Sequence, residues 1–303
     1  MAARHRVVVN PFSGNGHGRR IGTLLPGIFA RLGLTAEFHE SSTAEHFKAL
    51  VGGRPAEPGE RVVICGGDGS LNMALSCVTP GTRPALALVP CGRGNDVARS
   101  LAIPAHPDGA AAVLAEGRER AMDVGYVNDR PFASIAAMGF DALVSLAASR
   151  MRRVKGRMVY VIAAIKELAR FHPPLFTIES DTFTFQGRAM MVSVANCPYY
   201  GGGMMLSPDS KMDDGLVEIC VVLPMSKLGL LRMLPKLFTG GHVDSPYFLI
   251  ASAQRATIGC DPAVPICADG EYLTMSPATI RIEPAAATVM VPPMGISAGA
   301  PTP

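Results

Sequence analysis

The first third of the chain alternates short apolar runs with longer segments of helical spacing. Strand-like segments cover residues 5–10, 34–40, 61–65 and 85–90, and segments typical of helices follow them, one ending near Leu32 and another covering 43–52. Strands that alternate with helices at this spacing favour a parallel sheet. We therefore expect an α/β domain with a doubly wound parallel sheet, in which ligands bind beyond the carboxyl ends of the strands.

The pattern changes near Met122. Short strand-like runs separated by turn residues follow, at 122–140, 174–196 and 215–224. This pattern is typical of an antiparallel domain, into which we expect helical insertions at 142–171 and 225–239. The expected domains are 1–122 and 123–292. The tail 293–303 consists of small residues and proline and is expected to be disordered.

Three glycine-rich loops each follow an expected strand. They read NPFSGNGHG (10–18), GGDGS (66–70) and PCGRGND (90–96). Glycine lets the backbone approach phosphate oxygens, and neutral donors from Asn10, Ser13, Ser70, Asn72 and Asn95 accompany it. None of the loops has the order of a P-loop or of a dinucleotide fingerprint. The sequence therefore predicts a phosphate site of another kind.

Asp68 lies inside the second glycine loop, where a carboxylate would repel a phosphate. It therefore needs a further task, such as holding a metal ion, ordering water or handling a proton. The structural alternative is that Asp68 caps the helix that begins near Ser70, or tolerates the left-handed backbone of a turn. The sequence alone leaves both open.

Composition excludes several classes of protein. The 303 residues are 48% hydrophobic with a formal net charge of +3, which is too small to indicate nucleic-acid binding. The N-terminus fails as a signal peptide, and no apolar stretch is long enough to span a bilayer. Seven cysteines lie scattered, several in apolar runs (Cys65, Cys220), which favours free thiols in a reducing cytoplasm.

The three loops, in this order, resemble those of the diacylglycerol kinase-like lipid kinases. Further matches are MDVGYVNDRPFASIAAMGFDA, ANCPYYGGGMMLSPDSKMDDGLVEI and CADGEYL, so the resemblance extends from Val7 to about Pro292. The GGDGS loop is shared with NAD kinases, and the later stretches make the match specific to bacterial lipid kinases. The resemblance implies an α/β nucleotide domain, a C-terminal antiparallel β-sandwich and an active site in the cleft between them.

The resemblance also implies roles for individual residues. ATP would contact Gly66, Gly67, Asp68, Gly69, Ser70, Asn72 and Arg93, with Ser41 near the nucleotide. A structural Mg²⁺ would be held by the Asp214 carboxylate and the main-chain carbonyls of Lys211 and Leu216. Glu271 would match the catalytic acid.

Two positions depart from the family pattern. Arg93 stands where the third loop usually has threonine, and Met73 follows Asn72 where the second loop commonly has glutamate. A guanidinium could give a stronger, charged phosphate contact or could obstruct the site. A catalytically silent member of the family therefore stays open.

Asp269 and Glu271 in CADGEYL are two residues apart. On a strand they would share a face, as a metal ligand paired with a base requires. D-G is equally a strong hairpin signal, in which case the acids would be exposed turn residues. We name Glu271, Asp68 and Asp269 as the candidate catalytic acids.

Two basic apolar segments, 149–160 with five basic residues and 227–238, could bring the protein to anionic lipid. An ordinary solvated helix face is the alternative. We read the chain as an ATP- and Mg²⁺-dependent kinase of a diacylglycerol-like lipid, cytoplasmic and peripheral to the membrane. The rivals are an NAD kinase-like enzyme and a silent nucleotide- or lipid-binding regulator. A homodimer is compatible with the sequence.

Overall fold

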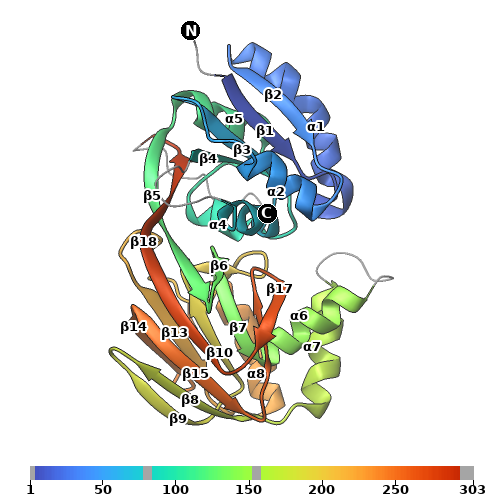
Figure 1. Cartoon of the computed structure of the whole chain (residues 1–303). Helices are drawn as coiled ribbons and strands as arrows, with labels where there is room; N and C mark the ends of the chain where they lie inside the picture. The colour runs from blue at the N-terminus through green and yellow to red at the C-terminus, as the bar shows by residue number, and fades with distance from the viewer. Residues whose placement is uncertain (1–3, 78–83, 152–157, 294–303) are drawn as a thin grey trace. The chain divides into compact units, whose positions relative to one another are not determined.

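The computed structural model describes residues 4–77, 84–151 and 158–293 (Figure 1). The chain divides into two units. The first consists of the residues up to Met122 together with those from Ala285 onwards, and the second extends from Asp123 to Pro284. Of the tail 293–303 that is expected to be disordered, residues 294–303 lie outside the described residues.

The first unit is a parallel α/β sheet. Its elements are β1 (Arg4–Val9), α1 (Ser13–Arg31), β2 (Thr35–Glu40), α2 (Ala44–Gly52), β3 (Arg61–Gly66), α3 (Asp68–Leu75), β4 (Ala85–Pro90), α4 (Asp96–Ser100) and α5 (Pro107–Glu116). The strand order is β2-β1-β3-β4, and every neighbouring pair is parallel. β1, β3 and β4 are buried almost throughout, which explains their continuous apolar runs.

The strand order reverses between β1 and β3. From β1 the chain crosses to β2 on one side, and β3 and β4 then extend the sheet on the other side. Ligands of doubly wound sheets bind beyond the carboxyl ends of the strands at such a switch point. The first and second glycine loops follow these two strands, so the topology directs attention to the same loops as the sequence.

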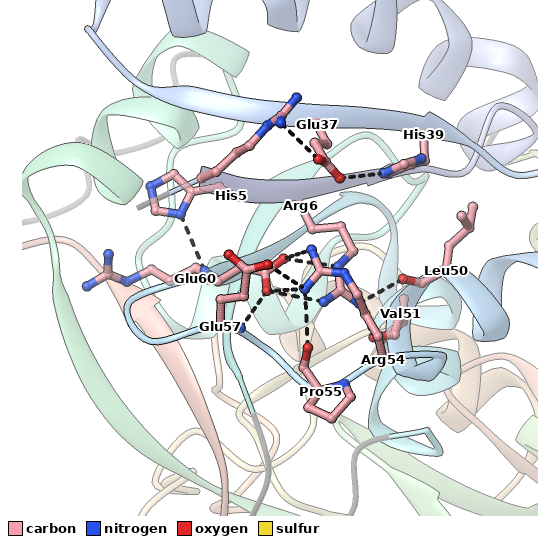
Figure 2. Close-up of polar contacts among 12 residues, drawn as sticks. His5, Arg6, Glu37, His39, Leu50, Val51, Arg54, Pro55, Glu57 and Glu60 are labelled. Atoms are coloured by element: carbon pink, nitrogen blue, oxygen red, sulfur yellow. Dashed lines mark hydrogen bonds and ion pairs between the residues drawn. The ribbon is translucent and has the colours of Figure 1, made fainter. Parts of the chain in front are cut away.

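Away from the carboxyl ends of the strands, a buried ion-pair network joins β1 to Glu60, the residue before β3 (Figure 2). Arg6 on β1 donates to Glu60, with an Nε–Oε1 distance of 3.1 Å, and Arg54 donates to the same carboxylate at 2.8 Å. Burial opposes ionisation of Glu60, but the hydrogen bonds from both arginines hold its pKa below the usual value. Arg6 also donates to the carbonyls of Leu50 and Val51, so one buried guanidinium joins β1 to the end of α2.

The second unit is an antiparallel β-sandwich with helices on one side. Its elements are β6 (Arg130–Phe132), β7 (Ile135–Gly139), α6 (Phe140–Arg150), α7 (Met158–Arg170), β8 (Leu175–Ser180), β9 (Thr184–Arg188), β10 (Met191–Ala195), β11 (Tyr199–Tyr200), β12 (Met204–Met205), β13 (Val217–Val222), α8 (Lys227–Leu237), β14 (Phe248–Ala253), β15 (Arg255–Asp261), β16 (Pro265–Ala268) and β17 (Glu271–Met275).

One sheet of the sandwich has the order β14-β13-β10-β7-β16-β17. Its inner face contributes Met138 and Ile219 to the sandwich core, and its outer face contributes Ala137 and Cys220 to a second core together with residues of α6, α7 and α8. Because both faces are covered, the central strands β7, β10 and β13 are buried at every position rather than at every second one.

Two strands are shared by the units. β5 (Arg118–Val127) leads out of the first unit, and β18 (Ala278–Val291) pairs with β15 near its start and with β4 near its end. Residues 285–292, which the sequence assigned to the second domain, therefore belong to the first unit.

The α/β domain and the antiparallel β-sandwich agree with the prediction. The first of the two expected helical insertions forms two helices rather than one. The segment 142–171 forms two helices, α6 and α7, with 152–157 outside the described residues, and the second insertion is α8. Residues 152–157, which include four of the five basic residues of the segment 149–160, thus lie outside the described residues. Of the helices in the described parts of the chain, none is both long enough and apolar enough to cross a membrane.

Candidate active site

The three glycine loops meet at the carboxyl ends of the parallel strands. A Cβ atom on Gly92 would lie 2.6 Å from the Cα atom of Gly67, and one on Gly14 would lie 2.2 Å from the carbonyl oxygen of Cys91. Such distances leave no room for any side chain. The second loop therefore contacts the third loop, and the first contacts the third, through bare backbone.

The first loop needs glycine for its backbone conformation as well. Gly14, Asn15 and Gly16 all have positive φ values, of 60°, 61° and 93°. This run of left-handed residues precedes the regular part of α1, and glycine is the residue that adopts such angles without strain.

Asn10, at the end of β1, joins the first and second loops. Its Nδ2 donates to the Ser70 hydroxyl at 2.9 Å, and its Oδ1 accepts from the Phe12 N–H at 3.1 Å. The Asn10 amide, expected to face a phosphate, therefore holds the loops together. Ser70 is buried.

Asp68 connects the second loop to α4. Its two carboxylate oxygens accept from the backbone N–H groups of Asp96 and Val97, each at 3.1 Å. The expectation that Asp68 caps a helix beginning near Ser70 is wrong, because α3 begins at Asp68 itself with Gly67 as its N-cap. The carboxylate instead satisfies the first N–H groups of a different helix, where negative charge is favourable.

The third loop is closed by Asn95. Its Oδ1 accepts from the Gly92 N–H at 2.8 Å and its Nδ2 donates to the Gly92 carbonyl at 3.1 Å. Asn95 adopts the left-handed conformation, with φ of 54°, as the N-cap of α4. Like Asn10, it is engaged within the protein rather than offered to a ligand.

The remaining residues expected to contact the nucleotide differ in burial and in hydrogen bonding within the protein. The Ser41 hydroxyl is buried and donates to the carbonyl of Val9, and Ser13, Gly69 and Asn72 are partly exposed at the loops. Arg93 is exposed and makes no hydrogen bond or ion pair with another described residue. A cation on this loop is therefore available to a ligand phosphate.

In the second unit, Asp269 and Gly270 form the two-residue turn of the β16–β17 hairpin. Ala268 pairs directly with Glu271, and both turn residues have positive φ, of 49° and 85°. D-G favours this turn. The expectation that Asp269 and Glu271 share a strand face is therefore wrong, because Asp269 lies in the turn and Glu271 is the first residue of β17.

Asp269 is also not the exposed turn acid that the hairpin alternative supposed. Its carboxylate accepts from the backbone N–H groups of Ala133, Ser134 and Ile135 at 2.8, 2.9 and 3.3 Å, and from the Ser134 hydroxyl. These bonds anchor the hairpin to the start of β7. Both oxygens of the Asp269 carboxylate are therefore engaged within the protein.

Glu271 differs from Asp269 in its exposure and in its hydrogen bonding. It is exposed, and its carboxylate has no hydrogen-bond or ion-pair partner among the residues that the structure describes. The hairpin fixes its backbone while its side chain stays available. Of the two acids, Glu271 is the one whose side chain is exposed.

The turn around Asp214, where the resemblance implies a metal ion, is stabilised by Asp123. This buried carboxylate accepts from the Gly215 N–H at 2.6 Å, and Asp214 accepts from the Leu216 N–H at 3.1 Å. Asp214 is exposed, and the structure brings it together with Lys211 at one pocket.

That pocket has a volume of about 460 Å³ and is rich in acids, with Asp209, Asp214 and Glu218 among its lining residues. Burial raises the pKa of Glu218, which accepts from the Ser210 hydroxyl. Within the described ranges no group of three or more His, Cys, Asp or Glu side chains could hold a metal ion. A cation here would need main-chain carbonyls and water as further ligands.

Asn196 is a supporting residue that the sequence analysis missed. It is buried, and its Nδ2 donates to the carbonyls of Asp123 and Ala133, each at 3.0 Å. Asn196 thus joins the segment anchored by Asp269 to the residue that holds the metal turn. Its signal in the sequence was an asparagine directly after the mostly apolar strand β10.

All seven cysteines are free thiols, and five are buried. Cys65 of β3 and Cys91 of the third glycine loop have their sulfur atoms 3.8 Å apart. Burial and this contact raise the pKa of Cys65, so it packs as a small apolar residue.

Comparison with known proteins adds independent information. The family model of the diacylglycerol kinase catalytic domain matches residues 4–127, and that of the YegS C-terminal NAD kinase beta sandwich-like domain matches 134–291. A diacylglycerol kinase of Mycobacterium tuberculosis is 33% identical over 298 residues, covering 95% of each chain, and one of Bacillus subtilis is 26% identical, covering 90% of this chain and 91% of that one.

A solved structure of similar fold is a putative diacylglycerol kinase from Bacillus anthracis. It has a TM-score of 0.79 with 19% identity and covers 97% of each chain, which supports the fold. The two family models follow one another in the order of the two units, and the mycobacterial relative extends over nearly the whole chain. The chain therefore belongs to the diacylglycerol kinase family, with a catalytic domain of that family followed by a YegS-type β-sandwich domain.

Proposed function

We propose that the protein transfers the γ-phosphate of ATP to a hydroxyl group of a diacylglycerol-like lipid. The observation that carries the proposal is the meeting of the three glycine loops at the switch point of the parallel sheet, with Gly67 and Gly92 packed backbone to backbone. Such loops offer main-chain N–H groups to phosphates. The names of the relatives supply the substrate class.

The proposal assigns ATP to the first unit. The phosphates would contact the backbone of Gly66, Gly67 and Gly69, with Arg93 as the available cation. Asn10, Asn95 and Asp68 would act on ATP through the loops that they hold. Ser13, Ser41, Ser70 and Asn72 would complete the polar surroundings of the nucleotide.

The proposal assigns the proton transfer to Glu271. As the lipid hydroxyl oxygen attacks the γ-phosphorus, the bond from that phosphorus to the bridging oxygen breaks, and ADP leaves with the electron pair. The hydroxyl proton passes to the Glu271 carboxylate, which is exposed and without a partner in the described chain. Asp269 would serve as a positioning residue.

The donors at the Asp214 turn fit a magnesium ion. The Asp214 carboxylate is exposed, and the main-chain carbonyls of Lys211 and Leu216 accept no hydrogen bond from any described residue. Oxygen ligands completed by water suit Mg²⁺. When bound, the ion would neutralise acidic charge at this turn, whose conformation Asp123 already holds.

Two rival functions remain distinct from this proposal. An NAD kinase-like enzyme would phosphorylate a small molecule in solution, and Arg93 and Met73 are the residues that favour a catalytically silent regulator. The cytoplasmic location expected from the cysteines stays a prediction, as do action at a membrane surface and a homodimer.

One experiment separates the three functions. ATP consumption is measured with a panel of lipid alcohols in mixed micelles, with small soluble alcohols and with NAD, each with and without Mg²⁺. The proposal expects Mg²⁺-dependent turnover with diacylglycerol and little with NAD. Turnover with NAD alone would support the first rival, and binding of nucleotide without turnover on any acceptor would support the second.

A further inference from the structure

Helix α8 has one face fixed against the second unit. Leu230 and Leu237 are buried, and Met233 and Leu234 pack on the same core beneath the helix. The Ser226 hydroxyl caps the helix by accepting from the Gly229 N–H at 3.0 Å. The orientation of the helix about its axis is therefore set by packing, and so is the face that it presents to solvent.

The solvent face of α8 is apolar where an ordinary surface helix is polar. Leu228 is 55% exposed, Leu231 42% and Phe238, the C-cap residue, 50%. At about 100° per residue these three side chains fall on one arc of the helix. Exposed large apolar side chains gathered in this way mark an interaction surface.

Basic residues border this apolar arc on both sides. Lys227 lies at one border, and Arg232 and Lys236 lie at the other; all three are exposed. Lys227 donates to the carbonyl of Ala169 at the end of α7, whereas Arg232 and Lys236 make no ion pair with any described residue. The sequence has no acidic residue between Glu218 and Asp244.

We propose that α8 docks the protein on an anionic phospholipid surface. Leu228, Leu231 and Phe238 enter the boundary between headgroups and acyl chains, and Arg232 and Lys236 pair with headgroup phosphates. The charge pattern selects this occupant, because an apolar arc with cations on both borders and no acid is what an interfacial helix requires. The inference rests on the proposed function, since a lipid acceptor is held in a membrane.

A tryptophan reporter tests insertion directly. The chain contains no Trp, so Phe238→Trp introduces a single fluorophore in the arc. Its emission should shift to shorter wavelength with vesicles containing phosphatidylglycerol and be quenched by brominated acyl chains, with no change for pure phosphatidylcholine. Leu24→Trp, on an exposed position of α1, is the matched control and should not respond. Equal responses from both reporters would overturn the proposal.

Vesicle sedimentation tests the two parts of the surface. The triple variant Leu228→Gln, Leu231→Gln and Phe238→Gln should bind phosphatidylglycerol vesicles at least about tenfold more weakly. Arg232→Glu with Lys236→Glu should lose at least about 30-fold, and this loss should shrink at high salt. Lys48→Glu, on an exposed position of α2, is the control for charge reversal and should leave binding close to that of the wild type.

Other occupants give different results. If the wild type is a dimer without lipid and the triple variant is a monomer by analytical ultracentrifugation, the surface is an interface between copies and the proposal fails. Unchanged vesicle binding by both variants also overturns it.

Activity separates this proposal from the proposed function. With a short-chain diacylglycerol dissolved as monomers, the α8 variants should keep the turnover of the wild type, and only turnover on vesicles should fall. If the wild type phosphorylates no lipid in either form but still binds vesicles through α8, the proposed function fails and the docking surface stands.

Discussion

The carboxylate of Asp68 accepts the backbone N–H of Val97 at 3.1 Å, which joins the second glycine loop to the helix after the third. Its other oxygen accepts the neighbouring N–H of Asp96. Asp68 thus stabilises the structure by joining the second glycine loop to α4. A test of its proposed catalytic role has to measure stability as well as turnover.

Asp68→Asn should affect both stability and turnover. The amide offers only one acceptor, so one N–H at the start of α4 loses its partner and the helix loses a favourable negative charge. We expect a loss of about 1 kcal/mol in the free energy of unfolding and a fall in turnover of about 100-fold or more. Urea denaturation and ATP consumption measure the two effects. Asp244→Asn, on an exposed loop, is the control. Turnover close to that of the wild type would remove Asp68 from the site.

Gly92→Ala should disrupt the contact between loops. Its Cβ atom would lie 2.6 Å from the Cα atom of Gly67, so backbone must move. We expect a cost of about 1–3 kcal/mol and weaker ATP binding, by urea denaturation and calorimetric titration. Gly27→Ala on α1, whose Cβ would meet nothing within 4 Å, should leave ATP binding unchanged and not destabilise the protein. Equal behaviour of the two variants would contradict the packing argument.

Arg93→Thr restores the residue usual at this position. If the exposed guanidinium contacts a phosphate, the variant should keep activity, bind ATP more weakly and show a smaller dependence of binding on salt. Titration of ATP at several ionic strengths measures this. Arg188→Thr, which removes an exposed arginine of β9, is the control. If Arg93→Thr leaves affinity and salt dependence untouched, the side chain points away from the nucleotide.

Glu271→Gln and Asp269→Asn should fail in different ways. Glu271→Gln removes an unpartnered, exposed carboxylate, so it should fold like the wild type, bind ATP and lose the chemical step. Asp269→Asn removes one acceptor from the cluster at Ala133, Ser134 and Ile135, so it should unfold at lower temperature. Single-turnover phosphorylation at saturating ATP and thermal unfolding separate the two. Loss of chemistry in Asp269→Asn alone, with unchanged stability, would show that we have named the wrong acid.

Asp141 gives a prediction about pH. It lies in the first turn of α6, and burial raises its pKa to about 6 from 3.8. Between about pH 4 and pH 6 the folded chain keeps a proton that the unfolded chain releases, so stability falls as pH rises through this window, by up to about 3 kcal/mol, and is level above it.

Asp141→Asn should remove that fall and make the protein more stable than the wild type at pH 7. Urea denaturation at pH 4, 5, 6 and 7 measures the difference. Asp108→Asn is the matched control, since Asp108 is an acid in the first turn of α5 that pairs with Arg31. It should not stabilise the protein at pH 7. Parallel curves for wild type and Asp141→Asn would contradict the burial argument.

The sequence predicted the fold through features that are local. Strands buried on both faces read as continuous apolar runs, as in VVV before Asn10, and the glycine loops stand directly after them. The D-G pair at 269 and 270 signalled a hairpin, which the structure contains. Each of these signals depends on residues that are close in the chain.

The side-chain partners could not be predicted because they are distant in the chain. Asp68 accepts hydrogen bonds from N–H groups that are 28 and 29 residues away along the chain. Asp269 accepts them from N–H groups that are 134 to 136 residues away. No pattern of spacing encodes such pairs. For the same reason, the sequence did not predict that the end of β18 belongs to the first unit. Its apolar residues indicate a strand, but its partner changes from β15 to β4 along its length.

That change of partner has a consequence for synthesis on the ribosome. Val289 of β18 pairs with Leu86 of β4, and these residues are separated by the whole of the second unit. While the chain is being translated, the outer edge of β4 has no strand to cover it until the last part of the protein emerges. An uncovered strand edge is a template for aggregation. The sheet of the first unit is therefore completed only after the second unit has been synthesised, whereas a domain made from one continuous segment has all its strands as soon as that segment emerges.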